Sequence, residues 1–318
     1  MVEFRMYVGL SGSGKSTLAE EFVREHNSNS YKWAHLSSDN VRKLLYGDEN
    51  CQDNPSAVFE HLNKATIDCL SAGISVAYDA TNLNSKRRKA LISRLRSACR
   101  DIVIDFTAVI IATPIGICVK QDKHRNRQVG EQVILKQLCS FQVPTAHEGW
   151  NHIELQYNCT EDVMNKHCSN YVWSAMEMNH DNPHHLDTVI AHLTAVADTM
   201  QKKVEECEDG YLITEPSNLV RSIGLLHDIG KIFTKTFDED GIAHYYGHDC
   251  ASSYLSLLYP AKFAVSHILL RAAVIGWHMR HFSFQTKEGF ENWLLTLTPS
   301  EYSLLRLVID ADKENSLP

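Results

Sequence analysis

One glycine-rich segment, Gly9–Thr17, limits most strongly what the first half of this chain can fold into. It reads G-L-S-G-S-G-K-S-T and fits the phosphate-binding pattern G-x-x-x-x-G-K-[ST]. The apolar run Met6-Tyr7-Val8 precedes it, and a helix-like pattern from Thr17 to Glu25 follows it. Loops of this kind direct backbone N–H groups at phosphate oxygens where a helix begins. The segment therefore predicts a strand, a loop and a helix that bind a nucleoside triphosphate.

Two side chains of this loop carry specific expectations. Lys15 is expected to reach the β- and γ-phosphates, and the Ser16 hydroxyl is expected to hold Mg²⁺. ATP with Mg²⁺ is thus the predicted cofactor. The alternative is a Gly-Ser loop without a ligand, which the flanking strand and helix patterns disfavour. The residues of the loop predicted to bind ATP and Mg²⁺ are Gly9, Gly12, Ser13, Gly14, Lys15, Ser16 and Thr17.

Strand-like and helix-like segments alternate as far as about Cys159, which predicts an α/β domain with a parallel sheet and helices on both faces. The expected strands are Phe4–Val8, Trp33–Leu36, Ile74–Tyr78, Ile102–Ile111 and His152–Asn158, and two of the expected helices are Pro55–Ser71 and Ser85–Ala98. An all-α domain is expected after them. Its helices are His185–Cys207, Asn218–Ile232, His248–Leu258, Lys262–His278 and Pro299–Asp312. The predicted domains are residues 1–165 and 175–318.

Charge and cysteine content narrow the function classes. Residues 1–159 carry 19 Lys and Arg against 17 Asp and Glu, whereas residues 160–318 carry 12 against 22. Ten of the 17 histidines also lie after position 179, in this acidic half, which favours metal chemistry over a grip on long nucleic acid. The nine cysteines form no C-x-x-C pair, as expected in a reducing compartment. With no signal peptide and no apolar run long enough to cross a bilayer, a cytoplasmic protein without a membrane partner is expected.

Polar residues follow the second expected strand and indicate phosphoryl transfer. In a parallel sheet the carboxyl end of a neighbouring strand faces the phosphate loop, so Asp39 is expected near the γ-phosphate. A carboxylate there can accept the proton of an attacking hydroxyl. Arg42, one helical turn later, is expected to hold a phosphate of the acceptor. The alternative that stays open is that Asp39 only caps a helix.

Further polar residues follow the third and fourth expected strands. Asp79 is expected to orient Mg²⁺ or its waters, and Thr81 and Asn82 are expected to turn the chain and face the acceptor. The basic cluster 86–89 either contacts phosphate or forms a solvated helix face. The basic segment Lys120–Arg127 is expected to be a helix that closes as a lid, where Arg125 would stabilise charge on the transferring phosphoryl group.

These residues together resemble the kinase domain of polynucleotide 5′-kinases, from about Tyr7 to Trp150. The resemblance rests on Gly9–Thr17, Ser38-Asp39-x-x-Arg42, Asp79–Asn84 with Arg87-Arg88, Val143–Thr145 and Glu148–Trp150. It implies ATP-dependent phosphorylation of a 5′-hydroxyl. Asp39 would be the general base, and Arg42 and Arg87 would bind the acceptor. Gln121 departs from the pattern, because the lid usually carries two arginines four residues apart. Either Lys123 or Arg127 compensates, or stabilisation of the γ-phosphate is weaker.

In the helical half, His227 and Asp228 adjoin each other at the end of an apolar stretch. Burying both is unfavourable unless they are paired, and a metal ion takes imidazole and carboxylate ligands together. His192 lies upstream, and Asp310 and Asp312 lie near the C-terminus. Such a nitrogen and oxygen site can generate hydroxide for phosphoester hydrolysis.

The stretch from about Asn182 to Lys313 resembles the HD phosphohydrolase superfamily and is similar to the HD domains of bacterial tRNA nucleotidyltransferases. The flanking segments Asn182–His185, Tyr245–Asp249 and Trp277–Met279 fit too. The resemblance implies that Lys231 faces a substrate phosphate and that the metal is Mn²⁺, Ni²⁺, Co²⁺, Fe²⁺, Zn²⁺ or Mg²⁺. His248 and His278 complete a second metal site, bind phosphate or are structural, and His180 is taken as structural. The implied ligands are His192, His227, Asp228 and Asp312, with Asp310 as the alternative.

A kinase and a phosphohydrolase have complementary tasks at a broken nucleic acid. Cleavage of RNA leaves a 5′-hydroxyl and a 2′,3′-cyclic phosphate or 3′-phosphate, and ligation needs the opposite ends. The pairing predicts an end-healing enzyme for RNA or DNA, with RNA favoured, that prepares ends for a separate ligase. Two alternatives stay open: a small-molecule or nucleoside kinase fused to an HD nucleotidase, and a nucleotide sensor without turnover.

Overall fold

The computed structural model describes residues 1–28, 32–125, 127–183, 187–206, 213–260 and 262–316. Contacts divide the chain into two compact units. The first consists of Met1–Gln137 and Pro144–Thr160, and the second of Leu138–Val143 and Glu161–Pro318. None of the helices within the described ranges combines the length and the apolar character needed to cross a lipid bilayer.

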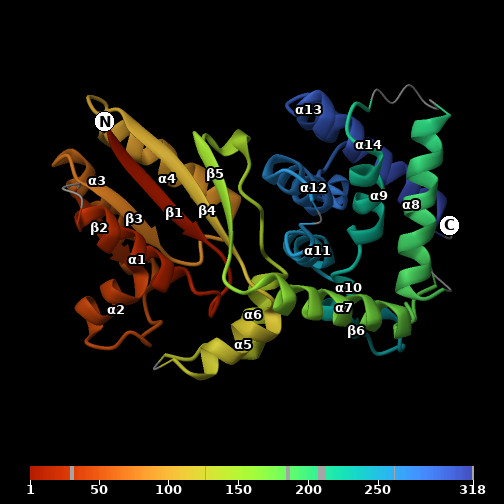
Figure 1. The fold of residues 1–318 in the computed structure, drawn as a ribbon, viewed down its shortest axis with the longest axis horizontal. Coiled ribbons are helices and arrows are strands. Elements are labelled where there is room, and N and C mark those ends of the chain that lie inside the picture. The colour runs from red at the N-terminus through yellow and green to blue at the C-terminus, as the bar shows by residue number, and fades with distance from the viewer. Residues whose placement is uncertain (29–31, 126, 184–186, 207–212, 261, 317–318) are drawn as a thin grey trace. The chain divides into compact units, whose positions relative to one another are not determined.

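The first unit is a sheet with flanking helices (Figure 1). Its strands are β1 (Val2–Val8), β2 (Trp33–Ser37), β3 (Ser75–Asp79), β4 (Ile104–Ala112) and β5 (His152–Tyr157). Its helices are α1 (Lys15–Ser28), α2 (Ser38–Tyr46), α3 (Pro55–Ser71), α4 (Ser85–Ala98), α5 (Ile115–Lys123), α6 (Glu131–Leu138) and the 3-10 turn η1 (Ala146–Glu148). The five expected strands are confirmed with ends that differ by at most about two residues.

All neighbouring strands of this sheet are parallel, in the order β2-β3-β1-β4-β5. The expectation that β2 borders the strand before the phosphate loop is wrong, because β3 lies between β2 and β1. Asp79, at the end of β3, therefore lies on the strand that borders β1, the strand before the phosphate loop. It lies opposite Tyr7 of β1. Asp39 approaches the same edge of the sheet from the first turn of α2.

Alternate residues of each strand pack against helices on opposite faces, as the period-two pattern of a strand requires. On one face, Tyr7 and Val109 form a core cluster with Phe22 of α1. On the other face, the ring of Phe106 contacts Phe4, and the guanidinium of Arg96 in α4 lies over it. The predicted parallel sheet with helices on both faces is thereby confirmed for the first unit.

The second unit is built mainly from helices. They are α7 (Glu161–Glu177), α8 (Val189–Glu205), α9 (Ser217–Leu226), α10 (Lys231–Thr234), α11 (His248–Ser256), α12 (Val265–Trp277), the 3-10 turn η3 (Arg280–Ser283), α13 (Lys287–Leu294) and α14 (Pro299–Glu314). The ends predicted for the helix His185–Cys207 lie outside the described residues. The helix α14 begins with a complete capping box, in which Thr298 and Glu301 satisfy each other's backbone N–H groups.

Two details of the predicted all-α domain are wrong. The strands β6 (Thr236–Phe237) and β7 (Ala243–His244) form a short antiparallel pair, and Asp238 stabilises their turn by accepting hydrogen bonds from the backbone. The helix expected over Asn218–Ile232 is interrupted between α9 and α10. The chain there forms i→i+3 turns, and the N–H of Gly230 donates to Ser252 Oγ (2.8 Å) instead of continuing the helix.

The helices α8 and α9 approach closely at Gly224. A Cβ atom at this position would lie 2.5 Å from Cα of Ala197, so only glycine fits. His192 lies on the buried stripe of α8, and His227 directly follows α9. The contact at Gly224 therefore sets the spacing between the helices that carry these two histidines.

We expect Gly224→Ala to destabilise the protein by ~1–3 kcal/mol, because the added methyl group meets backbone that cannot move aside alone. The matched control is Gly276→Ala in α12, where the added methyl group would contact only the Ser253 side chain, at 3.1 Å. Denaturant unfolding of both variants measures the difference. Equal unfolding midpoints for the two variants would contradict the close approach of α8 and α9.

Candidate functional sites

The predicted phosphate loop connects β1 to α1 and is held in shape by residues far along the chain. Gly14 has φ +91°, and a Cβ atom there would lie 2.1 Å from Nδ2 of Asn158. The carbonyl of Ser13 accepts hydrogen bonds from Asn158 Nδ2 and Thr113 Oγ1, both at 3.0 Å. Lys15 is 7% exposed and donates to the carbonyl of Leu10 (2.6 Å). These contacts from distant parts of the chain therefore fix the conformation of the loop.

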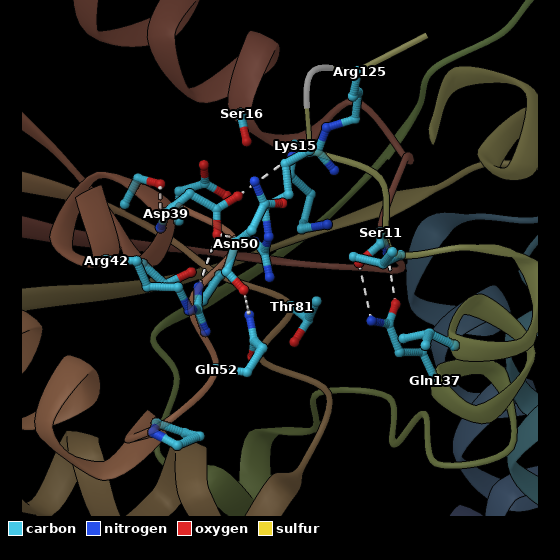
Figure 2. Close-up of a pocket in the computed structure, with 18 of the residues that line it drawn as sticks. Ser11, Lys15, Ser16, Asp39, Arg42, Asn50, Gln52, Thr81, Arg125 and Gln137 are labelled. Carbon is cyan, nitrogen blue, oxygen red and sulfur yellow. Dashed lines mark hydrogen bonds and ion pairs between the residues drawn. The ribbon is translucent and has the colours of Figure 1, made fainter. Parts of the chain in front are cut away.

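A second support holds the loop at Ser11, as Figure 2 shows. The backbone N–H of Ser11 donates to Gln137 Oε1 (2.8 Å), and Gln137 Nε2 donates to Ser11 Oγ (3.0 Å). The sequence analysis missed Gln137, because nothing in its spacing links it to a loop more than a hundred residues away. Asn158 was missed for the same reason.

A cavity of about 590 Å³ opens beside this loop. Eight predicted site residues line it: Lys15, Ser16, Asp39, Arg42, Asp79, Thr81, Arg87 and Arg125. The other predicted loop residues (Gly9, Gly12, Ser13, Gly14 and Thr17) and Asn82 are not among its lining residues. Lining residues that the sequence analysis did not single out include Asn50, Gln52, Phe59 and Gln128.

The carboxylate of Asp39 is surrounded by arginines within this cavity. Arg42 Nη1 lies 2.8 Å from Asp39 Oδ1, Arg125 Nη2 lies 3.4 Å from Oδ2, and Arg127 also pairs with Oδ1. Asp39 does not cap α2: Ser37 is the N-cap, and its hydroxyl accepts from the Asp39 N–H (3.2 Å). The Asp39 side chain and three cationic groups therefore face the cavity together (Figure 2).

Asp79 is buried beside the phosphate loop. Its Oδ2 lies 3.4 Å from Nε2 of His35, a residue of the adjacent strand β2. Burial by itself would raise the pKa of Asp79, but the contact with His35 and the charge of Lys15 lower it below its ordinary value. Burial lowers the pKa of Lys15. An ionised carboxylate next to Ser16 has the chemistry that a Mg²⁺ site needs.

Asn82 holds the turn that follows β3 in place through hydrogen bonds of its side chain and its backbone carbonyl. It adopts φ 52°, and its Nδ2 donates to the carbonyl of Tyr7 (2.7 Å). Its own carbonyl accepts from Arg88 Nη1 (2.8 Å), and Arg88 forms a buried two-fold ion pair with Glu148. Trp150 Nε1 also donates to Glu148 (3.0 Å). The segment Glu148–Trp150 and Arg88 therefore support the turn that presents Thr81.

The predicted lid differs from expectation in its secondary structure. The helix expected over Lys120–Arg127 ends at Lys123, so Arg125 and Arg127 follow it outside α5. The buried carboxylate of Asp122 accepts from the N–H groups of Val129 and Gly130 (3.0 and 2.9 Å) and returns the chain toward α6.

The position that departs from the kinase pattern has a partner in the structure. Gln121 Oε1 lies 3.5 Å from Asn158 Nδ2, the group that also binds the phosphate loop. Of the two proposed substitutes for the missing arginine, Arg127 lines the cavity and Lys123 is exposed and does not.

The second unit brings the predicted metal ligands together. His192, His227, Asp228 and Asp312 place their ligand atoms within 4.8 Å of one another, and Asp228, His248 and His278 form a second such group. Asp310 belongs to neither of these two groups of described residues, whereas Asp312 belongs to the first.

Asp228 is shared between the two groups through its two oxygens. Oδ2 lies 3.7 Å from His192 Nε2 and 3.6 Å from His227 Nε2, and Oδ1 lies 3.1 Å from His248 Nε2 and 3.3 Å from His278 Nε2. Asp312 Oδ1 closes the first group at 3.1 Å from His192. The carboxylate of Asp228 thus belongs to both groups of possible metal ligands, with one oxygen facing each.

Three histidines are oriented alike. Nδ1 of His227, His248 and His278 each bonds to the carbonyl three residues earlier, at 2.7–2.8 Å. The Nδ1–H must be the donor, so in the neutral form of each imidazole Nε2 carries the lone pair and faces the cluster. Nε2 of His227 and of His278 are buried and make no hydrogen bond to another described residue. The donor set therefore fits divalent transition metals.

The electrostatics of the cluster keep its carboxylates ionised. Burial alone would raise the pKa of Asp228, but the charges of Lys231 and His227 hold it well below its usual range. The contacts with His192 and His227 likewise lower the pKa of Asp312 against the effect of burial. The pKa of His227 is raised in turn, because attraction to Asp228 and Asp312 outweighs its burial. Both carboxylates are therefore ionised near neutral pH, as metal ligands must be.

Lys231 lies beside this cluster rather than in solvent. Its Nζ is 2.5 Å from Asp228 Oδ2, 3.3 Å from His180 Nε2 and 5.3 Å from the centre of the Tyr245 ring. Burial and the charge of Lys231 lower the pKa of His180 to about 4, so this histidine is neutral near pH 7. The sequence predicted only a structural role for His180. The structure places it next to Lys231 and His192.

Comparison with known proteins gives matches for the first unit. A curated relative, the adenylyl-sulfate kinase of Buchnera aphidicola subsp. Schizaphis graminum, is 32% identical over 124 residues, which cover 36% of this chain and 53% of the relative. The chain thus spans about half the length of the curated relative that it matches.

Solved structures to which this chain is similar in part include a Pnkp1/Rnl/Hen1 RNA repair complex (23% identity, TM-score 0.34, 43% of this chain and 42% of that chain). A fungal RNA kinase is 14% identical (TM-score 0.37, 53% and 81% covered). The APS kinase CysC of Mycobacterium tuberculosis with AMPPNP and APS is 18% identical (TM-score 0.37, 53% and 96% covered).

A family model described as "AAA domain" matches residues 5–144. This range contains the phosphate loop, Asp39, Asp79 and the arginines of the cavity. Residues 5–144 are therefore similar to this AAA domain model, and part of the chain is similar in sequence to a kinase.

Proposed function

We propose that this protein is a bifunctional end-healing enzyme for nucleic acids, and for RNA in particular. Its first unit would phosphorylate a 5′-hydroxyl with ATP, and its second would hydrolyse a 2′,3′-cyclic phosphate or 3′-phosphate. The observation that carries the proposal is the presence of both sites in one chain: an arginine-lined phosphate-loop cavity around Asp39, and two histidine groups that share Asp228. A separate ligase would act on the healed ends.

The kinase step follows from the groups that face the cavity. The acceptor oxygen attacks the γ-phosphorus, the bond to the β–γ bridging oxygen breaks, and ADP leaves. Asp39 accepts the proton of the attacking hydroxyl, and Arg42 holds a phosphate of the acceptor. Arg125 and Arg127 would turn from Asp39 to the phosphoryl oxygens as negative charge arrives. Lys15 and Ser16 bind the phosphates and Mg²⁺, with Asp79 behind them.

The hydrolytic step would use the buried cluster. His192, His227, Asp228 and Asp312 would hold one divalent metal, and His248 and His278 with the other oxygen of Asp228 would hold a second. Bound metals supply an activated water and stabilise charge on the phosphoryl oxygens. Lys231 is placed to attract a substrate phosphate, and His180, neutral beside it, can hold its orientation. Water adds to phosphorus, and the ribose oxygen leaves as a hydroxyl.

A second candidate function has an observation of its own. The curated relative that matches the first unit is an adenylyl-sulfate kinase, which acts on a small acceptor. The nearly neutral charge of residues 1–159 also fits a small substrate better than a polynucleotide. In this alternative the first unit phosphorylates a small alcohol or nucleoside, and the second hydrolyses nucleotides.

The two functions can be separated with one substrate. We expect a short RNA with a 5′-hydroxyl and a 2′,3′-cyclic phosphate to gain a 5′-phosphate and lose the cyclic phosphate, as followed by mass spectrometry with ATP, Mg²⁺ and Mn²⁺ or Ni²⁺. Lys15→Ala should abolish only the first change, and Asp228→Ala only the second. An unchanged RNA, with ATP consumed on small alcohols or nucleosides, would support the small-molecule alternative.

The role of Asp39 gives a second prediction. Asp39→Asn should lower the rate of phosphoryl transfer by roughly 10²–10⁴-fold, because an amide cannot accept the proton, while ATP binding persists. The matched control is Asp101→Asn. Asp101 is exposed and precedes β4, so it lies at the amino ends of the strands, whereas Asp39 lies at their carboxyl ends. Single-turnover transfer of labelled γ-phosphate measures both variants. A rate within about threefold of the parent protein would remove Asp39 from the general-base role.

The metal centre gives a third prediction. We expect two equivalents of Mn²⁺ or Ni²⁺ per chain by elemental analysis, because Asp228 serves both groups. Asp228→Asn should lose both equivalents, and His248→Ala should lose one. Asp310→Asn, the control, should retain both, because Asp310 lies in neither group of described ligands. One equivalent in the parent protein would limit the centre to the group that contains Asp312.

A further inference from the structure

A cluster of aromatic side chains lies directly after the last histidine of the metal centre. It is formed by the segment that connects α12 to α13 and by α13 itself (blue in Figure 1). We call these residues the aromatic patch: Arg280, His281, Phe282, Phe284, Phe290 and Trp293. The catalytic proposal above uses none of them.

The patch is linked to the metal centre by a short series of contacts. His278 Nε2 lies 3.3 Å from Asp228 Oδ1. The carbonyl of His278 accepts a hydrogen bond from His281 Nδ1 (3.0 Å), and the His281 ring lies 3.9 Å from that of Phe282, measured between centroids. Burial lowers the pKa of His281. The charge of Lys313 lowers it further, whereas the charge of Asp312 opposes the shift. The aromatic patch thus begins two residues after His278, the last histidine of the cluster around Asp228.

The outer member of the patch is not part of a hydrophobic core. Phe282 is 73% exposed, whereas Phe284, Phe290 and Trp293 are half-buried against one another, with centroids 5.6–5.9 Å apart. The guanidinium of Arg280 covers the Trp293 ring at 4.3 Å. The exposed Phe282 is therefore joined to the half-buried rings through His281, whose ring also lies 6.0 Å from that of Phe290.

We infer that the aromatic patch binds the nucleobase of the nucleotide whose phosphate lies at the His-Asp centre, by stacking on Phe282. This inference rests on the proposed hydrolase function and specifies its substrate class. Exposed aromatic rings bind unpaired bases by stacking, which tolerates any base because every base has an aromatic face. Arg280 complements the phosphate backbone in an otherwise acidic half of the chain. The expected occupant is therefore the terminal nucleotide of a single strand.

The test compares two phosphomonoesters on the metal-loaded, full-length protein. Adenosine 3′-monophosphate carries a base, and glycerol 2-phosphate does not. Phe282→Ala should raise KM for the adenosine ester by roughly tenfold, as loss of one stacked base predicts, and leave the glycerol ester and the metal content unchanged. Phe282→Tyr should restore the parental KM. The matched control is Trp173→Ala, which removes a 62% exposed ring from α7.

Binding without turnover separates this inference from the hydrolase proposal. Calorimetry with adenosine 3′-phosphorothioate, a slowly hydrolysed analogue, should show about tenfold weaker binding for Phe282→Ala. If neither ester is hydrolysed but this difference persists, the hydrolase proposal fails and the base-binding patch stands. Equal effects of Phe282→Ala on both esters, unchanged analogue binding, or the same loss in Trp173→Ala would overturn the inference.

Discussion

The second unit depends on one buried charge, the carboxylate of Asp228, which is only 2% exposed. Removing a carboxylate from water costs several kcal/mol unless opposite charges and hydrogen bonds surround it. Here α8, the ends of α9 and α12, and the start of α11 each supply a histidine around it, and Lys231 lies on the remaining side. Three of these imidazoles use Nδ1 for a backbone carbonyl and therefore turn Nε2 toward the cluster. The helix ends that pack together around Asp228 therefore also bring together the imidazole nitrogens and carboxylate oxygens that can bind a cation.

The first unit has the opposite balance around its cavity. Lys15, Arg42, Arg125 and Arg127 face Asp39 and Asp79, so positive groups exceed carboxylates before any ligand arrives. Such an excess favours a polyanion, and the preformed loop around Ser13 adds backbone N–H groups to it. The first unit thus gathers cationic groups around its cavity, and the second gathers carboxylates and imidazoles.

Much of this could be predicted from the sequence, because strong signals are local. Apolar runs gave the five strands, and adjacent polar residues such as His227 and Asp228 pointed to a site. The errors come from tertiary structure. The place of β3 between β2 and β1 depends on which strands pair, and the break after α9 depends on Ser252, which takes the N–H of Gly230. Gln137, Asn158 and His180 reach their sites only through the fold, so no spacing in the sequence could reveal them.

Neither unit is a continuous stretch of chain, because residues 138–143 belong to the second unit although residues on both sides belong to the first. Phe141 is fully buried, and its ring contacts Tyr254 of α11. A fragment that ends at Thr160 would keep this phenylalanine without its partner. A fragment that ends before it would lose β5, an edge strand of the sheet. Recombination or truncation at a single point therefore damages one unit or the other, which gives an architectural reason for the two units to be inherited together.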